Sequence, residues 1–91
     1  MHEIQKTSTY SRQYHVLVLR FRRMVDEAVD IIKESPLDYK SKITKISKHK
    51  DGVMYRFRLP GFYIMYVVPP FEGEESVVIT LLDIKSLTKR V

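Results

Sequence analysis

The chain has 91 residues and a mass of 10.8 kDa, the size of one compact domain, and we expect residues 1–91 to form a single unit. Hydrophobic residues make up 44% of the chain and charged residues 30%, a balance that excludes a disordered protein. The chain has no cysteine, which excludes disulfide bonds and thiol catalysis, and its apolar runs are too short to span a bilayer, so we expect a cytoplasmic protein.

The net charge of +5 comes from one short stretch of the sequence. Residues 1–39 hold six basic and six acidic side chains, and residues 59–91 hold three basic and four acidic ones. Residues 40–58 hold seven basic side chains against Asp51 alone. Such a concentration of cations is typical of a surface that binds a phosphate backbone or an acidic partner. The alternative is a lysine-rich loop that is merely well solvated.

The first third of the chain predicts a strand followed by a helical region. Residues 3–9 alternate weakly and contain threonines, which indicates a strand of about six residues, and Ser11 can cap a helix. Apolar residues recur at steps of three and four from Tyr14 to Ile32, as in an amphipathic helix. We expect the region to end before Pro36, whose ring disfavours the helical conformation of the residue before it. The pattern leaves open whether one helix or two form.

The rest of the chain predicts a three-stranded meander. A polar, basic connector follows Pro36 and runs to the turn Asp51-Gly52. Val53–Leu59 alternates cleanly, whereas Phe62–Val68 and Ser76–Ile84 are apolar on both faces, so all three segments predict strands. This order predicts an α+β fold, in which the N-terminal strand and the helical region pack on one face of a small antiparallel sheet.

Arg56 and Arg58 carry the most specific chemistry in the sequence. At positions i and i+2 of a strand, their side chains project from the same face about 7 Å apart. The neighbouring run Lys48-His49-Lys50 adds to this charge. Together they predict a cationic surface that suits successive phosphates or the carboxylates of a partner. The alternative is a strand face that bears only solubilising charge.

The other polar residues give weaker signals. His49 has a side chain suited to proton exchange near neutral pH, but a loop histidine between two lysines is more often a plain surface residue. The other histidines are not at ligand spacing to it, and the glutamates of residues 72–75 lack the pattern of a calcium loop. We therefore expect no metal and no cofactor. Tyr63 is of interest because it follows the turn after the two arginines.

Four segments follow a recurring order. Tyr10-Ser-Arg-Gln-Tyr14 with Leu17 is similar to an F-x-x-x-L helix entered from a strand, and residues 31–36 match a helix that ends in glutamate, a small residue and proline. Residues 55–66 are similar to the hairpin Y-R-x-R-x-G-x-Y-R-x-x-Y, and residues 77–90 to a last strand with a basic tail. In this order the chain resembles the RelE/ParE superfamily of toxins from toxin–antitoxin modules, and the resemblance implies the RelE-like form of the α+β fold.

The resemblance also implies an activity. Ribosome-dependent members of the superfamily cleave mRNA without a metal and so inhibit translation. A 2′-hydroxyl attacks the adjacent phosphate, while basic side chains neutralise the developing charge and exchange protons. The catalytic residues implied for this chain are Arg56, Arg58, Tyr63 and Lys85, and the implied RNA-binding residues are Lys48, His49, Lys50, Lys89 and Arg90.

Two departures from the superfamily pattern keep other functions open. Tyr63 stands where the turn motif has an arginine, and the sequence reads Lys89-Arg90-Val91 where members have a terminal tyrosine. One alternative is a non-enzymatic inhibitor of DNA gyrase, as in the ParE branch, and another is a catalytically inactive relative. Either active form implies a cognate antitoxin, an acidic chain that covers the basic face, and the nuclease also implies the ribosome and mRNA as partners.

Overall fold

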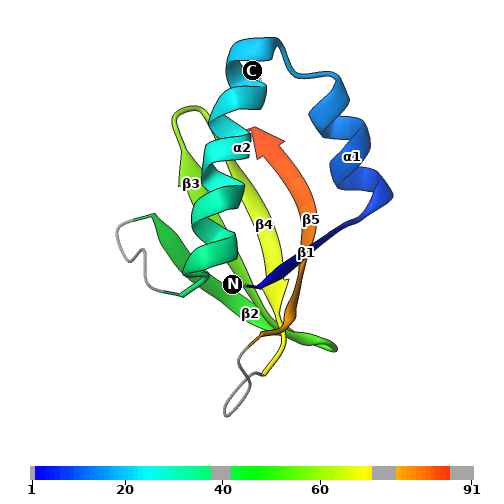
Figure 1. Ribbon diagram of the computed structural model, residues 1–91, viewed down its shortest axis with the longest axis vertical. Coiled ribbons are helices and arrows are strands. Elements are labelled where there is room, and N and C mark those ends of the chain that lie inside the picture. The colour runs from blue at the N-terminus through cyan, green and yellow to red at the C-terminus, as the bar shows by residue number, and fades with distance from the viewer. Residues whose placement is uncertain (1, 38–41, 71–75, 87–91) are drawn as a thin grey trace.

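A five-stranded sheet with two helices on one face makes up the protein (Figure 1). The computed structural model describes residues 2–37, 42–70 and 76–86. The elements in chain order are β1 (Glu3–Lys6), α1 (Ser8–His15), α2 (Leu19–Glu34), β2 (Ile43–His49), β3 (Gly52–Leu59), β4 (Phe62–Val68) and β5 (Val78–Ser86). No helix among these residues is long and apolar enough to cross a membrane.

The predicted α+β class is confirmed, but the sheet is mixed rather than purely antiparallel. Its strand order is β1-β5-β4-β3-β2, and every neighbouring pair is antiparallel except β1 and β5, which run parallel. A parallel pair needs a long connection between its strands, and here that connection is the whole of the chain between β1 and β5.

The prediction of a connector between Pro36 and Asp51 is wrong for Ile43–His49, because this segment forms the edge strand β2. Most of its side chains are exposed, so the segment has no apolar alternation by which a strand is recognised. Its strand conformation comes from antiparallel pairing with β3, in the register Ile43 opposite Phe57 and His49 opposite Gly52. Gly52, at φ 149°, starts β3 so close to β4 that a Cβ atom there would collide with the carbonyl oxygen of Val68.

The helical region consists of two helices that meet at an elbow. Val16 closes α1, and Val18 precedes α2 in an extended conformation. The hydroxyl of Thr7 caps α1 by accepting a hydrogen bond from the Tyr10 N–H at 3.1 Å, so the prediction that Ser11 is the cap is wrong. The first strand is accordingly shorter than predicted, whereas the end of α2 at Glu34, just before Pro36, is confirmed.

The hydrophobic core lies between α2 and the helix-facing side of the sheet. It contains Val25, Ala28 and Ile32 from α2, and inward-facing residues of three strands: Phe57, Leu59, Phe62, Ile64, Tyr66, Ile79, Leu81 and Ile84. The buried Tyr66 hydroxyl donates a hydrogen bond to the carbonyl oxygen of Pro36 at 2.8 Å, which ties the end of α2 to the central strand.

Candidate nucleic-acid interface

The cross-strand register gathers the four predicted catalytic residues on the side of the sheet opposite the core. Arg58 lies opposite Tyr63, and Tyr63 lies opposite Lys85, which makes one row across β3, β4 and β5. Two residues further along, Arg56, Met65 and Asp83 make a second row. The rows are about 7 Å apart along the strands. We call these six residues the basic grid.

The alternation of side chains on β3 and a bulge on β5 orient the side chains of the basic grid. On β3, Phe57 and Leu59 enter the core, and because side chains alternate along a strand, Arg56 and Arg58 face the other way. On β5 the alternation is interrupted by a bulge at Leu82.

The bulge decides which residues of β5 join the basic grid. The buried residues Leu81 and Ile84 are three positions apart rather than two, so Asp83 and Lys85 both point away from the core. If β5 alternated regularly from Leu81 onward, Asp83 and Lys85 would both face the core. The step from Leu81 to Ile84 is the one signal in the sequence that could have revealed Asp83, which the prediction missed.

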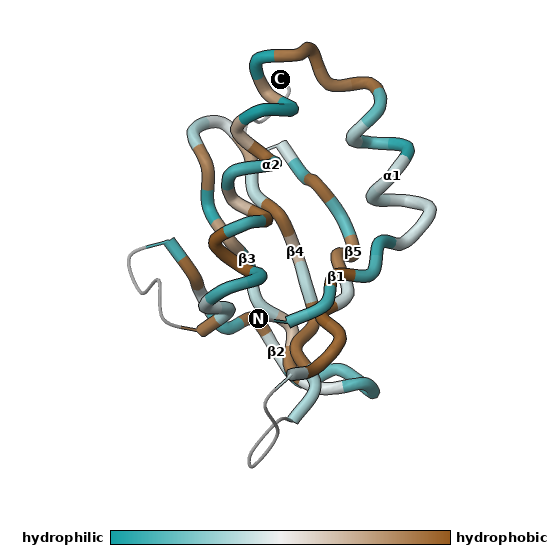
Figure 2. The backbone as a smooth tube through the Cα atoms, viewed as in Figure 1, coloured by the Kyte–Doolittle hydropathy of each residue, from teal (hydrophilic) through white to brown (hydrophobic). Residues whose placement is uncertain are grey.

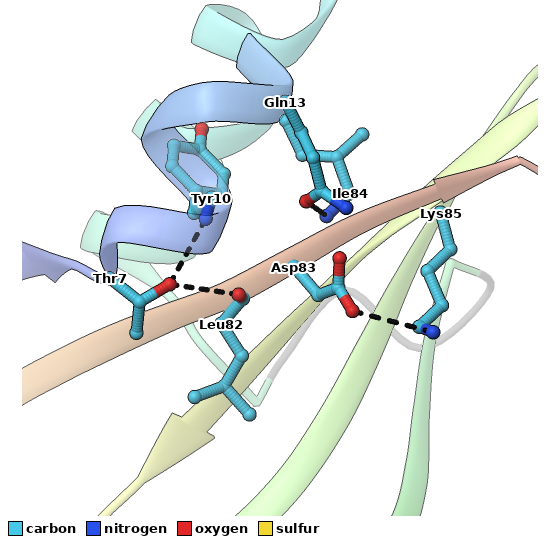
Figure 3. A network of polar contacts seen from close by, with 7 residues as sticks. All are labelled: Thr7, Tyr10, Gln13, Leu82, Asp83, Ile84 and Lys85. Atoms are coloured by element: carbon cyan, nitrogen blue, oxygen red, sulfur yellow. Dashed lines mark hydrogen bonds and ion pairs between the residues drawn. The ribbon is translucent and has the colours of Figure 1, made fainter.

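Helix α1 holds the bulge in place through two side chains (Figure 3). The Thr7 hydroxyl donates a hydrogen bond to the carbonyl oxygen of Leu82 at 2.9 Å. The Gln13 side-chain oxygen accepts one from the Ile84 N–H at 2.7 Å. β1 pairs with β5 only as far as Leu81, so these bonds satisfy backbone groups on the edge of β5 that β1 no longer covers.

Contacts within the basic grid fix two of its cations. The Arg56 guanidinium lies over the Tyr63 ring, 5.2 Å from its centre, in a cation–π contact. The Lys85 ammonium lies 3.4 Å from one carboxylate oxygen of Asp83 (Figure 3). Arg58 and Lys85 are exposed, whereas Arg56 and Tyr63 are half-buried. The arrangement presents three cations and one phenol on a single surface, which suits binding of a phosphodiester.

The basic grid continues past Arg58 to Lys42, the residue before β2. The Arg58 N–H donates a hydrogen bond to the carbonyl oxygen of Lys42 at 2.7 Å. Lys42 and Arg58 line a surface hollow of about 340 Å³ together with Leu59 and Pro60. Lys42 is thus a further cation beside the basic grid that the sequence did not single out.

The run Lys48-His49-Lys50 lies elsewhere, at the turn of the β2–β3 hairpin. Lys48 pairs with Val53, five residues before Arg58 on β3, which corresponds to about 17 Å along the strand. His49 is occupied locally, since its Nδ1 accepts a hydrogen bond from the Asp51 N–H at 3.1 Å. The predicted proximity of this run to both arginines is therefore wrong. Lys89 and Arg90 lie outside the described residues.

A second surface feature is apolar and lies at the elbow between α1 and α2. Figure 2 shows the elbow as a hydrophobic stretch, and Val16 and Leu19 are 81% and 63% exposed. Beside them is a pocket of about 430 Å³, lined mainly by Leu17, Phe21 and Phe62 together with Ile84 and Gly61. The same part of the chain, residues 12–25, has four arginines and no acidic residue. An amphipathic, acidic segment of a partner would complement this surface.

The part of the chain that the structure describes contains no group of three or more histidine, aspartate or glutamate side chains arranged to hold a metal ion. The basic grid itself contains guanidinium, ammonium, phenol and carboxylate groups.

The fold is that of RelE toxins. No family profile and no curated protein matches the sequence, but solved structures match it along almost its whole length. A chain of the archaeal RelE–RelB complex from Pyrococcus horikoshii OT3 superposes with a TM-score of 0.78 at 20% sequence identity, covering 98% of each chain. The isolated E. coli RelE toxin superposes with a TM-score of 0.73 at 14% identity, covering 99% of this chain and 88% of that one. The RelE-like fold implied by the sequence motifs is confirmed.

Proposed function

We propose that the protein is the toxin of a toxin–antitoxin module and that it cleaves mRNA on the ribosome without a metal ion. The observation that carries this proposal is the basic grid, in which Arg56, Arg58 and Lys85 surround Tyr63 on one face of the sheet. The RelE fold supports it. A cytoplasmic location is part of the proposal, because the substrate is mRNA on the ribosome.

The grid suits a reaction that builds negative charge on phosphorus. The 2′-hydroxyl oxygen of the substrate attacks the adjacent phosphate and loses its proton to water. The bond from phosphorus to the 5′-oxygen breaks, this oxygen takes up a proton, and a 2′,3′-cyclic phosphate and a 5′-hydroxyl form. Arg56 and Arg58 can each donate two parallel hydrogen bonds to phosphate oxygens, and the stabilisation is greatest where charge develops. Lys85 adds a third cation in the row of Arg58.

Tyr63 is the better of the two predicted proton carriers. It lies between the cations of the grid, and Arg56 stacks on its ring. His49 lies at the far end of the β2–β3 hairpin with its Nδ1 bonded to the Asp51 backbone. We therefore assign protonation of the leaving 5′-oxygen to the Tyr63 hydroxyl and no catalytic role to His49.

A cognate antitoxin is the second part of the proposal. The RelE–RelB complex from Pyrococcus horikoshii shows that a protein of this fold is found with a partner chain. In this chain the two surfaces that suit an acidic, amphipathic partner are the basic grid and the apolar elbow with its flanking arginines. Covering the basic grid would neutralise the cations that RNA binding requires.

The test is a cell-free translation reaction with purified protein, in which primer extension maps the ends of the message. We expect new ends that depend on ribosomes, and we expect Arg56→Ala with Arg58→Ala to abolish them. Arg12→Ala with Arg23→Ala is the matched control, because it removes the same charge from exposed helix positions. Equal loss of cleavage in both double variants would contradict the assignment of the basic grid.

One observation favours the gyrase-inhibitor alternative. Tyr63 replaces an arginine of the toxin motif, so the face has one cation fewer than a full phosphate clamp. An intact message and normal translation in the assay above would contradict the nuclease proposal. Inhibition of gyrase supercoiling by the same protein would then support the alternative.

A further inference from the structure

Asp83 is the one acidic residue of the basic grid. It lies on β5 opposite Met65, in the row that begins with Arg56, and two positions before Lys85. Neither β3 nor β4 carries an acidic side chain. A carboxylate on a phosphate-binding surface repels phosphate, so contact with the RNA backbone does not account for it.

The Asp83 carboxylate is poorly satisfied within the protein. Its Oδ2 atom lies 3.4 Å from the Lys85 ammonium, beyond the roughly 2.7–2.9 Å of a charge-assisted hydrogen bond, and Lys85 is half exposed. Its Oδ1 atom is buried and has no hydrogen-bond partner, and it is the only such side-chain atom among the described residues. Figure 3 shows this oxygen pointing away from Lys85. Buried polar atoms normally have partners, so an unpaired carboxylate oxygen is costly.

Binding of a phosphate would worsen this imbalance. Lys85 stands in the row of Arg58 and Tyr63, and a phosphate bound to that row would draw the ammonium away from Asp83. The carboxylate would then lose its one cation while remaining only 21% exposed. A donor from the ligand can then bond to Oδ2, the oxygen that Lys85 has left, because Oδ1 is buried.

We propose that Asp83 is a specificity residue that accepts a hydrogen bond from the nucleotide beside the bound phosphate. This inference rests on the proposed function of the basic grid as an RNA-binding site. The donor is an O–H or N–H group, and a nucleotide has two sources: the ribose 2′-hydroxyl and an N–H of the base. A 2′-hydroxyl donor would distinguish RNA from DNA, whereas a base donor would distinguish one base from another.

The experiment compares the wild type with Asp83→Asn, which keeps the shape of the side chain and removes its charge. Dissociation constants are measured by fluorescence anisotropy for short single-stranded probes. One arm compares an RNA with the DNA of the same sequence, and the other compares RNA homopolymers of uridine, cytidine and adenosine. Asp30→Asn is the matched control, since it removes the same charge from an exposed position of α2.

We expect the wild type to discriminate at least about tenfold in one of the two arms, as a hydrogen bond to a charged group allows. In Asp83→Asn, the ratio of the dissociation constants in that arm should fall to within about threefold of one. Every probe should also bind more tightly, because a repelling charge is gone. Asp30→Asn should keep the wild-type ratio. The arm in which the ratio falls identifies the donor as ribose or base.

Two results would overturn the inference while leaving the proposed function intact: wild-type protein that discriminates in neither arm, or Asp83→Asn protein with an unchanged ratio. In either case Arg56→Ala with Arg58→Ala must abolish RNA binding in the same assay. Wild-type protein that binds none of the RNA probes would overturn the inference, whereas the proposed function, which acts on the ribosome, is decided by the primer-extension assay. Circular dichroism checks that each variant folds, and Asp83→Ser, which also removes the charge, serves with the same expectation if Asp83→Asn does not fold.

Discussion

The ring and the hydroxyl of Tyr63 have separable roles. The ring supports the Arg56 guanidinium at 5.2 Å, and the hydroxyl is the proposed proton donor to the leaving oxygen. A positioned acid contributes roughly 10²–10⁴-fold to a rate, whereas an exposed cation–π contact contributes far less, of order 0.5–1 kcal/mol. A substitution that removes only the hydroxyl can therefore distinguish proton donation by Tyr63 from the support that its ring gives to Arg56.

We expect Tyr63→Phe to lower ribosome-dependent cleavage by about a hundredfold or more while RNA binding is unchanged. Tyr63→Leu should reduce cleavage and also weaken RNA binding, because Arg56 loses the ring on which it rests. Primer extension measures cleavage, and anisotropy measures binding. Wild-type cleavage by Tyr63→Phe would show that another group carries the proton.

At the scale of elements, α1 and the bulge in β5 act as one unit. Thr7 ends the first strand, caps α1 through the Tyr10 N–H and donates to the Leu82 carbonyl. Gln13, nearly two turns later, accepts from the Ile84 N–H. A short helix of eight residues with exposed ends is marginal by itself, so these bonds to β5 are part of what keeps it folded. The same bonds hold the segment that presents Asp83 and Lys85.

Replacing Thr7 by valine should therefore lower the free energy of unfolding by about 1–2 kcal/mol, since it removes the cap and a partly buried hydrogen bond to Leu82 while keeping the side-chain shape. Ser11→Ala, at the cap position that the sequence suggested, should change stability by less than about 0.5 kcal/mol. Urea denaturation followed by circular dichroism measures both. Equal losses in the two variants would contradict the cap seen in the structure.

For the whole molecule, the two sides of the sheet have opposite characters. The core side holds the apolar residues of α2 and three strands, together with two buried tyrosines, Tyr10 and Tyr66. The other side carries the basic grid. Burial raises the pKa of both tyrosine hydroxyls above their ordinary value of 10.0. The core thus favours their neutral forms, which links the stability of the fold to pH.

Below about pH 10 both hydroxyls are protonated in the folded and the unfolded chain, so they add no pH dependence. Above pH 10 the unfolded chain loses these protons first, and stability should fall as the pH rises toward the higher pKa of the folded state. Tyr66→Phe should make this fall shallower, although it lowers stability at neutral pH because the Pro36 carbonyl loses its donor.

Urea midpoints at pH 7 and pH 10.5 measure this dependence. Tyr63→Phe is the matched control, because its hydroxyl lies on the opposite side of the sheet. If stability falls between pH 7 and pH 10.5 as steeply in Tyr66→Phe as in the wild type, burial of the Tyr66 hydroxyl does not contribute to the pH dependence.

The sequence by itself determined the features that depend on near neighbours along the chain. The period-two pattern of β3 assigned Arg56 and Arg58 to the side opposite Phe57, and the three-and-four pattern assigned the core face of α2. Both patterns are visible locally because one element either buries or exposes each of its own side chains.

Only the tertiary structure decided which strands pair and in what register. β2 is a strand because β3 lies beside it, the bulge at Leu82 turns Asp83 and Lys85 outward, and the pairing of β3 with β4 places Tyr63 next to Arg58. Hydrogen bonds between residues distant in sequence fix these relations, and no local periodicity encodes them. The candidate residues could thus be named from the sequence, but the basic grid, with an acidic residue among its cations, exists only because the sheet brings three strands together.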